Sequence, residues 1–357
     1  MERFEPLCRR MEWLDPFYKA VWEQAFKDAI PISGTFELTP RCNFNCRMCY
    51  VHLEEERIPD YGIEMSGEEW IKIAEAAKDT GTTWLCITGG EPLMHPDFKN
   101  VWRKINQMGF FITLQTNGAL ISGDILDLFQ EYPPKAVKIS LYGTNDEIYE
   151  QVCRVKNGFK KVDSAIISLQ KMQIPIELVS TIIKHNEKDL YNMFAYAVKH
   201  KVQWGNTVGI KQSIRGADMK ASDLQIENEK IQENFRKKIK NRIEHSSTVE
   251  VKPCMMCKDY RLGYWITWNG EMRFCGFMNE PHISVRENTF KNAWKKLIDY
   301  EEHLEWPEEC KECKAQKGCL RCAGLLSTVS GDPRKTAKEF CSRVKQYYDE
   351  KNERWNI

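Results

Sequence analysis

Three cysteines near the N-terminal end of the chain have a spacing that suits metal binding. Cys42, Cys46 and Cys49 follow one another as C-x3-C-x2-C. Thiolates on so short a loop can ligate three irons of a [4Fe–4S] cluster, and the fourth iron then stays open to another ligand. A zinc site, or a cluster that takes a fourth thiolate from elsewhere, fits the same residues. The spacing predicts a metal centre and leaves its type open.

Eight further cysteines lie in the last third of the 357-residue chain. They are Cys254, Cys257, Cys275, Cys310, Cys313, Cys319, Cys322 and Cys341. Eight thiolates suffice for two four-cysteine iron–sulfur sites. Two zinc sites need the same number, and C-x2-C pairs are typical of zinc as well as iron. Because the N-terminus has no apolar signal segment, we expect metal ligands here and not disulfides.

Polar and glycine-rich residues follow three successive strand-like segments between these two groups of cysteines. Glycines allow a ligand to approach the backbone closely, and a carboxylate can bind an amine. A Gly-Gly-Glu-Pro sequence is also an ordinary turn. Because polar residues also follow the next two strands, the pattern predicts a ligand site at the carboxyl edge of a sheet. The residues are Gly89-Gly90-Glu91-Pro92, Asn117 and Ser140.

The elements that must position these residues alternate between strands and helices. Predicted strands span 35–39, 84–88, 110–115, 136–141, 176–183 and 203–210. A capping box of Ser66 and Glu69 opens one intervening helix, whose apolar face includes Trp70 and Ala77. Six β/α units predict an α/β fold, a partial (β/α)6 TIM-like barrel, with an open sheet as the alternative.

The pattern changes after the sixth predicted strand. Residues 222–244 are highly charged with a narrow apolar stripe, which predicts a solvated bridging helix. Segment 264–274 predicts a hairpin, with Asn269-Gly270 in a type I′ turn. We expect a small cysteine-rich iron–sulfur domain to follow the barrel. The expected division is 1–33 extension, 34–215 barrel, 216–249 bridging helix, 250–345 auxiliary-cluster domain and 346–357 tail.

From Gly34 to Ile210 the sequence resembles the radical S-adenosylmethionine (SAM) superfamily. The resemblance implies that Cys42, Cys46 and Cys49 hold a [4Fe–4S] cluster whose open iron binds SAM. It also implies that Gly89, Gly90, Glu91 and Pro92 bind the SAM amino group, with Asn117 and Ser140 as contacts for its ribose and carboxylate. The family often has an aromatic residue before the third cysteine. Met48 stands there in this chain and Tyr50 follows, so no adenine ligand is assigned.

The C-terminal cysteines resemble the SPASM extension that follows many radical SAM domains. Gly270-x4-Cys275 and Cys310-x2-Cys313-x5-Cys319 match it closely, while the x2 spacing to Cys322 departs from the commoner three residues. The resemblance implies two auxiliary [4Fe–4S] clusters, three in all. The first would use Cys254, Cys257, Cys275 and Cys322, and the second Cys310, Cys313, Cys319 and Cys341.

Cys8, Cys86 and Cys153 remain outside these sets. Cys86 lies in an apolar strand and is expected in the core. Cys153 is a candidate hydrogen-atom donor, and a core or surface thiol is the alternative. Its neighbour Arg154 could reach the SAM carboxylate or lie exposed.

The resemblance implies an enzyme that cleaves SAM reductively to a 5′-deoxyadenosyl radical and abstracts a substrate hydrogen. We expect a peptide or protein substrate that is crosslinked, given a thioether or oxidised. The alternative is oxidation or decarboxylation of a small metabolite; a non-enzymatic electron carrier or a zinc-stapled binding protein is a third. Because 33 residues precede the barrel, a separate leader-peptide-binding protein is expected, with flavodoxin or ferredoxin as electron donor.

Composition gives no sign of a nucleic-acid or membrane partner. The net charge is +1 and the sequence pI about 7.5. No segment approaches the roughly 20 apolar residues that a membrane-spanning helix needs. We expect a cytoplasmic protein.

Overall fold

A computed structural model describes residues 16–229, 231, 233, 253, 261–313, 319, 322–336, 338 and 341–342. Within them, nine strands form one sheet in the order β6-β5-β4-β3-β2-β1-β7-β8-β9. The bounds are β1 Ser33–Glu37, β2 Trp84–Thr88, β3 Phe111–Thr116, β4 Ala136–Ser140, β5 Ile176–Thr181, β6 Gln203–Thr207, β7 Gly263–Ile266, β8 Glu271–Arg273 and β9 Ile283–Ser284. All six predicted strands are confirmed, with ends shifted by at most three residues.

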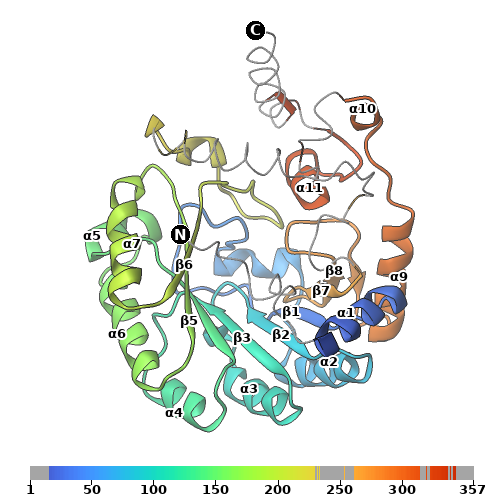
Figure 1. Ribbon diagram of the computed structural model, residues 1–357, viewed down its shortest axis with the longest axis horizontal. Helices are drawn as coiled ribbons and strands as arrows, with labels where there is room; N and C mark the ends of the chain where they lie inside the picture. Colours follow the sequence, from blue (N-terminus) through green and yellow to red (C-terminus); the bar gives the residue numbers. More distant parts are fainter. Residues whose placement is uncertain are drawn as a thin grey trace.

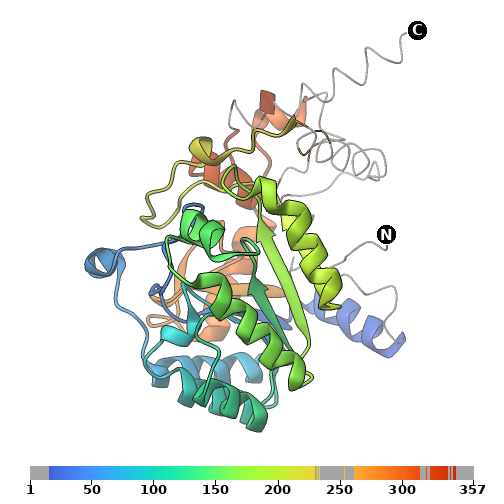
Figure 2. The same ribbon diagram turned by 90° about the vertical axis from the view of Figure 1, so that its left-hand side faces the viewer.

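Helices cover the outer face of the parallel strands, which curve as a partial barrel (Figure 1). The α-helices are α1 Pro16–Asp28, α2 Gly67–Asp79, α3 Phe98–Gln107, α4 Asp124–Glu131, α5 Asp146–Cys153, α6 Gly158–Lys171, α7 Leu190–Lys199, α9 Phe290–Glu302, α10 Glu308–Lys311 and α11 Ala323–Ser330. Short 3-10 turns are η2 Glu55–Tyr61, η3 Pro92–Met94, η4 Glu187–Asp189 and η5 Ala221–Leu224. The turned view in Figure 2 shows α10 and α11 beyond one end of the barrel. The prediction of an α/β partial barrel is confirmed.

The two faces of the parallel strands differ in chemistry. Phe36, Ile87 and Leu114 point toward the helices and are at most 1% exposed, and Phe36 packs 5.0 Å from the ring of Trp70. Cys86 lies on the opposite, inner face between its sheet partners Thr35 and Thr113, and is half-buried. The expectation that Cys86 is a core residue was wrong, because strand side chains alternate and its neighbours Leu85 and Ile87 take the core positions.

Helix α2 begins as the sequence predicts and fixes the end of β1. The Ser66 hydroxyl accepts from the Glu69 backbone N–H at 3.3 Å, and the Glu69 carboxylate accepts from the Ser66 N–H at 2.8 Å, which completes the capping box. Trp70 is fully buried, and its indole N–H donates to the carbonyl of Leu38 at 3.3 Å. The start of the cysteine loop after β1 is therefore anchored to a well-packed helix.

The predicted hairpin is present, but the sequence did not predict where it joins the sheet. β7 and β8 pair antiparallel, while β7 also pairs parallel with β1, so the hairpin extends the barrel sheet at its first strand. The predicted type I′ turn was wrong, because only Gly270 has a positive φ (86°) whereas this turn needs two. The Asn269 side chain instead donates to the carbonyl of Tyr61 at 3.1 Å.

Most of the predicted bridging helix 222–244 lies outside the described residues. Its described start contains η5, followed by non-helical residues 225–228. None of the helices that the structure describes has the length and apolarity required to cross a membrane.

Candidate active site

The three N-terminal cysteines lie on a loop that follows β1 and packs on the end of α5. Backbone N–H groups of Asn45 and Arg47 donate to the carbonyls of Cys153 and Val152 at 3.1 and 2.9 Å. The Cys49 N–H donates to the Cys46 carbonyl at 3.0 Å, which tightens the loop. All three motif cysteines are half-buried. The loop is therefore held from both sides by backbone contacts that do not use the thiols.

The surroundings of these thiols favour the neutral form in the absence of a metal. Burial raises the pKa of Cys42, and it raises the pKa of Cys49 to about 12. For Cys46 the neighbouring Cys153 thiol raises the pKa, with burial as the second cause. A bound metal removes such protons, because its charge stabilises the thiolate. Three soft sulfur donors on one loop are the ligand type that iron–sulfur clusters use, so the residues fit a cluster.

Among the residues that the structure describes, no group of three or more cysteine, histidine or acidic side chains is arranged to hold a single metal ion.

The Gly-Gly-Glu-Pro turn after β2 packs directly against the start of the cysteine loop. A Cβ on Gly90 would lie 2.4 Å from the carbonyl oxygen of Arg41, and one on Gly89 would lie 2.8 Å from that of Thr39. The N–H groups of Gly90 and Glu91 donate to these same two carbonyls at 2.7 and 2.8 Å. The glycines were expected to let a ligand approach the backbone closely. In the structure, the backbone of Thr39 and Arg41 lies close to them.

Glu91 is fully buried and joins β2 to the end of β3. The Thr116 hydroxyl lies 2.7 and 2.8 Å from its two carboxylate oxygens, and the Asn117 N–H donates to it at 2.8 Å. Burial raises its pKa to about 7, against the lowering effect of these hydrogen bonds. This carboxylate was expected to face an amine. Its described partners are groups of the protein itself.

Asn117 connects this hydrogen-bonded turn to the cysteine loop. Its side-chain amide donates to the Asn43 side chain at 2.7 Å and lies 4.0 Å from the Cys42 sulfur. The structure thus brings together three of the predicted segments, those of Cys42, Glu91 and Asn117. Ser140 ends the next strand, β4, where it is half-buried and hydrogen-bonds the Tyr142 side chain.

Cys153 is buried at the end of α5, with its thiol beside that of Cys46. Its thiol therefore contacts the cysteine loop, and its role as a hydrogen-atom donor or as a core residue stays a prediction. Arg154 donates to the Asn45 side chain at 3.2 Å, so it contacts the cysteine loop.

At the C-terminal sites, the structure brings Cys275 and Cys322 together. A Cβ on Gly324, in the first turn of α11, would lie 3.1 Å from the Cys275 sulfur and 3.7 Å from that of Cys322. These two belong to the same predicted auxiliary site. Their predicted partners Cys254 and Cys257 lie outside the described residues. Cys310, Cys313, Cys319 and Cys341 are half-buried, and their grouping stays a prediction.

A set of residues that the sequence did not single out connects the two cysteine regions. Tyr50, directly after Cys49, packs 5.0 Å from the ring of Phe277, close to Cys275. Buried Glu37 accepts from Arg215 at 2.8 Å and from the Trp265 indole at 2.9 Å. The acidic residue Glu37 at the end of β1 was the one sequence signal for this set.

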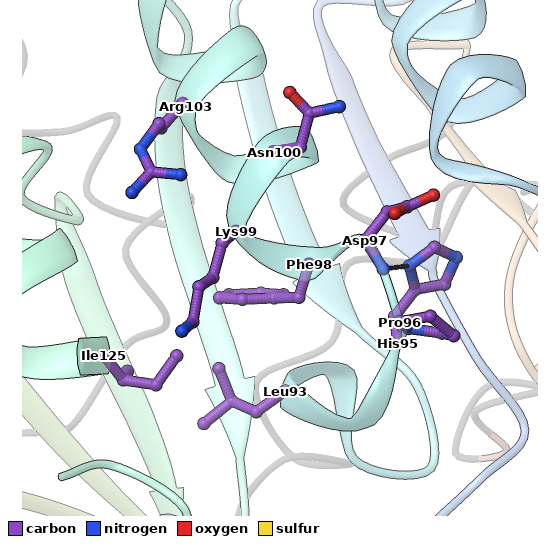
Figure 3. A pocket seen from close by; sticks show the side chains of 9 residues that line it. All are labelled: Leu93, His95, Pro96, Asp97, Phe98, Lys99, Asn100, Arg103 and Ile125. Atoms are coloured by element: carbon purple, nitrogen blue, oxygen red, sulfur yellow. Dashed lines mark hydrogen bonds between the residues drawn. The ribbon is translucent and has the colours of Figure 1, made fainter. Parts of the chain in front are cut away.

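The structure also has a cavity of about 360 Å³ that is separate from these sites. It lies where η3 leads into α3, and Figure 3 shows Lys99, Phe98 and Leu93 around it. Lys99 pairs with Asp124 at 2.5 Å, so its charge is already compensated. None of the predicted site residues lines this cavity.

The family model of the Radical SAM superfamily matches residues 36–197. Over this segment, just under half of the chain, the protein is similar to the radical SAM superfamily. The matched segment contains the cysteine loop, the Glu91 turn, Asn117 and Ser140.

Relatives with known roles fall into two groups. The antilisterial bacteriocin subtilosin biosynthesis protein AlbA of Bacillus subtilis is 28% identical over 165 residues, which are 46% of this chain and 36% of AlbA. The AdoMet-dependent heme synthase of Methanosarcina barkeri is 23% identical over 330 residues, 83% of this chain and 92% of that protein. Among solved structures, Streptococcus suis SuiB bound to S-adenosylmethionine superposes with a TM-score of 0.64 at 15% identity, covering 96% of this chain and 83% of SuiB. This similarity extends the shared fold beyond the radical SAM domain.

Proposed function

We propose that this enzyme cleaves SAM reductively and uses the resulting 5′-deoxyadenosyl radical to modify a peptide or protein. The substrate would be crosslinked, given a thioether or oxidised after loss of a hydrogen atom. The observation that carries the proposal is the continuous contact between the Cys42 loop, Asn117 and the buried Glu91 turn. It sets three thiols beside a rigid, polar strand edge, where a bound cofactor can be oriented.

The cofactors in this proposal are SAM and three [4Fe–4S] clusters. Cys42, Cys46 and Cys49 would hold the first cluster, which supplies the electron that breaks the C–S bond of SAM. Gly89, Gly90, Glu91, Pro92, Asn117 and Ser140 would surround SAM. Because the Glu91 carboxylate is engaged by Thr116 and Asn117, we infer that it orients this edge and that backbone groups of the turn meet the SAM amine. The auxiliary clusters would use the two cysteine sets given above.

A peptide substrate is supported by the role of AlbA in bacteriocin biosynthesis. The inner face of the barrel is half-buried and polar, which suits the backbone of an extended peptide. We further propose a separate leader-peptide-binding protein, with flavodoxin or ferredoxin as electron donor. The division of the chain at 34–215 and 250–345 belongs to the same proposal.

A second candidate is radical oxidation or decarboxylation of a small metabolite. The sequence similarity extends over 92% of the heme synthase but over only 36% of AlbA, and this difference in the matched share favours the second candidate. Both candidates use the same SAM chemistry and differ in the substrate alone.

Anaerobic reconstitution followed by SAM and reductant tests the shared chemistry. We expect about twelve irons per chain, four for each of three clusters, and release of 5′-deoxyadenosine. Replacement of Cys42, Cys46 and Cys49 by alanine should abolish that product and remove about four irons. The matched control is Cys86→Ala, which should keep both. Iron-loaded protein that produces no 5′-deoxyadenosine would refute the proposal.

The substrate class is tested by co-expression with short open reading frames encoded beside this gene. Loss of hydrogens from such a peptide, detected by mass spectrometry, supports the peptide proposal. Unchanged peptides, together with release of CO2 or oxidation of a metabolite from the same operon, support the second candidate.

A further inference from the structure

Lys211 is a half-buried cation beside the Cys275 loop. It lies after β6, in a segment tied to the cysteine loop by the Ile214 N–H, which donates to the Tyr50 carbonyl at 2.9 Å. The Lys211 nitrogen lies 5.2 Å from the centre of the Phe277 ring. At this distance the cation is attracted to the face of the ring, which holds it in place.

Phe277 and the two described cysteines of the first auxiliary site converge on one point. The Cβ position of Gly324 lies 3.3 Å from Phe277 Cβ, close to the distances that it makes with the sulfurs of Cys275 and Cys322. A side chain at position 324 would press on the Cys275 sulfur and on Phe277, so the glycine keeps α11 close to both cysteines. Burial lowers the pKa of Lys211, while the charges of Cys322 and Cys275 act to raise it. Because Lys211 lies over the Phe277 ring and Phe277 borders the same point as the two sulfurs, the ammonium lies near both thiols.

Two arginines also border this loop. Arg215 and Arg273 donate to the backbone carbonyls of Gly276 and Asn279 at 3.4 and 2.6 Å. Glu37 compensates Arg215. Lys211 has no carboxylate within ion-pair distance among the residues that the structure describes, and its one described contact of this kind is with an aromatic ring.

Two acidic residues near Arg273, Glu271 on β8 and Glu280 in the loop after it, have other partners. Glu271 and Glu280 act electrostatically on Arg273, and both also pair with His282 at 3.0 and 3.2 Å. The described ion-pair partner of both carboxylates is His282, and the described neighbour of the Lys211 ammonium is the Phe277 ring.

We propose that Lys211 raises the reduction potential of the auxiliary cluster held by Cys275 and Cys322. This inference rests on the proposed function, which places a [4Fe–4S] cluster at these cysteines. One-electron reduction adds a negative charge to such a cluster, and a nearby cation with little solvent around it stabilises the reduced form. The electron would come from the substrate radical, which is oxidised, and would pass on to an external electron carrier. Lys211 would act on the potential of the cluster through its charge, and it is not a catalytic residue.

The test is a redox titration of the reconstituted holoenzyme, without substrate, followed by electron paramagnetic resonance. Signals that change on adding SAM mark the SAM-binding cluster, so the others report the auxiliary clusters. In Lys211→Met we expect one SAM-insensitive signal to titrate at a more negative potential than in wild type. Lys211→Arg should keep the wild-type potential, because it keeps the charge. Lys220→Met, an exposed lysine on the same segment, is the matched control and should also be unchanged.

The outcomes separate this inference from the proposed function. Equal auxiliary potentials in Lys211→Met and wild type would overturn the role of Lys211 and leave the SAM chemistry intact. Absence of any SAM-insensitive signal in wild type, with about four irons per chain, would overturn both the role and the cluster set. If the methionine variant binds less iron, Lys211→Gln provides a second neutral variant, and a wild-type potential in it would equally reject the inference.

Discussion

Glu91 illustrates how one buried side chain can connect the segments of a candidate site. It has no exposed surface, and it accepts hydrogen bonds from Thr116, Asn117 and Leu93. Burial raises its pKa to about 7 from an ordinary 4.5. Between these two values the folded protein keeps a proton that the unfolded chain releases. Stability from this group is therefore present below about pH 4.5 and is lost as the pH rises to about 7.

We expect Glu91→Gln to remove this pH dependence. The wild-type free energy of unfolding, relative to the variant, should fall by on the order of 3 kcal/mol between pH 4.5 and pH 7. Urea denaturation of both proteins at several pH values measures the difference. Glu68→Gln, an exposed residue on α2, is the control and should run parallel to wild type. A constant difference between wild type and Glu91→Gln across that range would contradict the raised pKa.

At the residue scale, the sequence predicted the members of the candidate site better than it predicted their contacts. The positions of Cys42, Glu91 and Asn117 were predicted, and they lie together. The engagement of Glu91 was not, because it depends on the register between β2 and β3. Arg215 has a positive φ of 52° and reaches Glu37, 178 residues away in the sequence, and no local pattern signals such a contact.

At the element scale, the turn after β2 and the cysteine loop form one unit. A Cβ added at Gly90 would meet the carbonyl oxygens of Arg41 and Pro40, which are both backbone atoms. A side chain at this position cannot be relieved by a rotamer change. It has to move the segment that leads into Cys42.

We expect Gly90→Ala to destabilise the protein by about 1–3 kcal/mol and to lower the iron retained at the first site. The cause is overlap of the new Cβ with the Arg41 carbonyl oxygen at 2.4 Å. Thermal denaturation and iron analysis after gel filtration measure the two effects. Gly209→Ala is the matched control, since its nearest neighbour lies at an ordinary 3.4 Å. Full stability and full iron content in Gly90→Ala would show that the loop tolerates the shift.

Regular elements were more predictable than the connections between them. Strand alternation and the Ser66 capping box are local signals, and both were confirmed. The turn at Asn269 was wrong because its side chain bonds to Tyr61, in a distant segment. Tertiary contacts of this kind override the turn preference of a two-residue sequence.

At the scale of the whole molecule, the barrel is completed by the C-terminal region. β7 pairs with β1 across about 230 residues of sequence, with Ser33 opposite Gly263 and Phe36 opposite Ile266. Without β7, the edge of β1 would carry unpaired N–H and C=O groups. The predicted boundary at residue 215 therefore separates two segments that share one sheet.

The closeness of this pairing depends on Gly34, and we expect Gly34→Ala to uncouple the two regions. A Cβ on Gly34 would lie 2.4 Å from the Tyr264 hydroxyl oxygen, in the contact between β1 and β7. The substitution should cost about 1–3 kcal/mol, because Tyr264 is also fixed by the Thr82 hydroxyl at 3.2 Å and by the ring of Phe290. Denaturant unfolding of Gly34→Ala, Tyr264→Leu and the double variant gives the coupling. In the Tyr264→Leu background the alanine should cost less by roughly 0.5–3 kcal/mol, since the shorter side chain leaves space for the methyl group. Equal costs in both backgrounds would mean that the β1–β7 contact does not limit stability, and that the barrel tolerates separation from the C-terminal region.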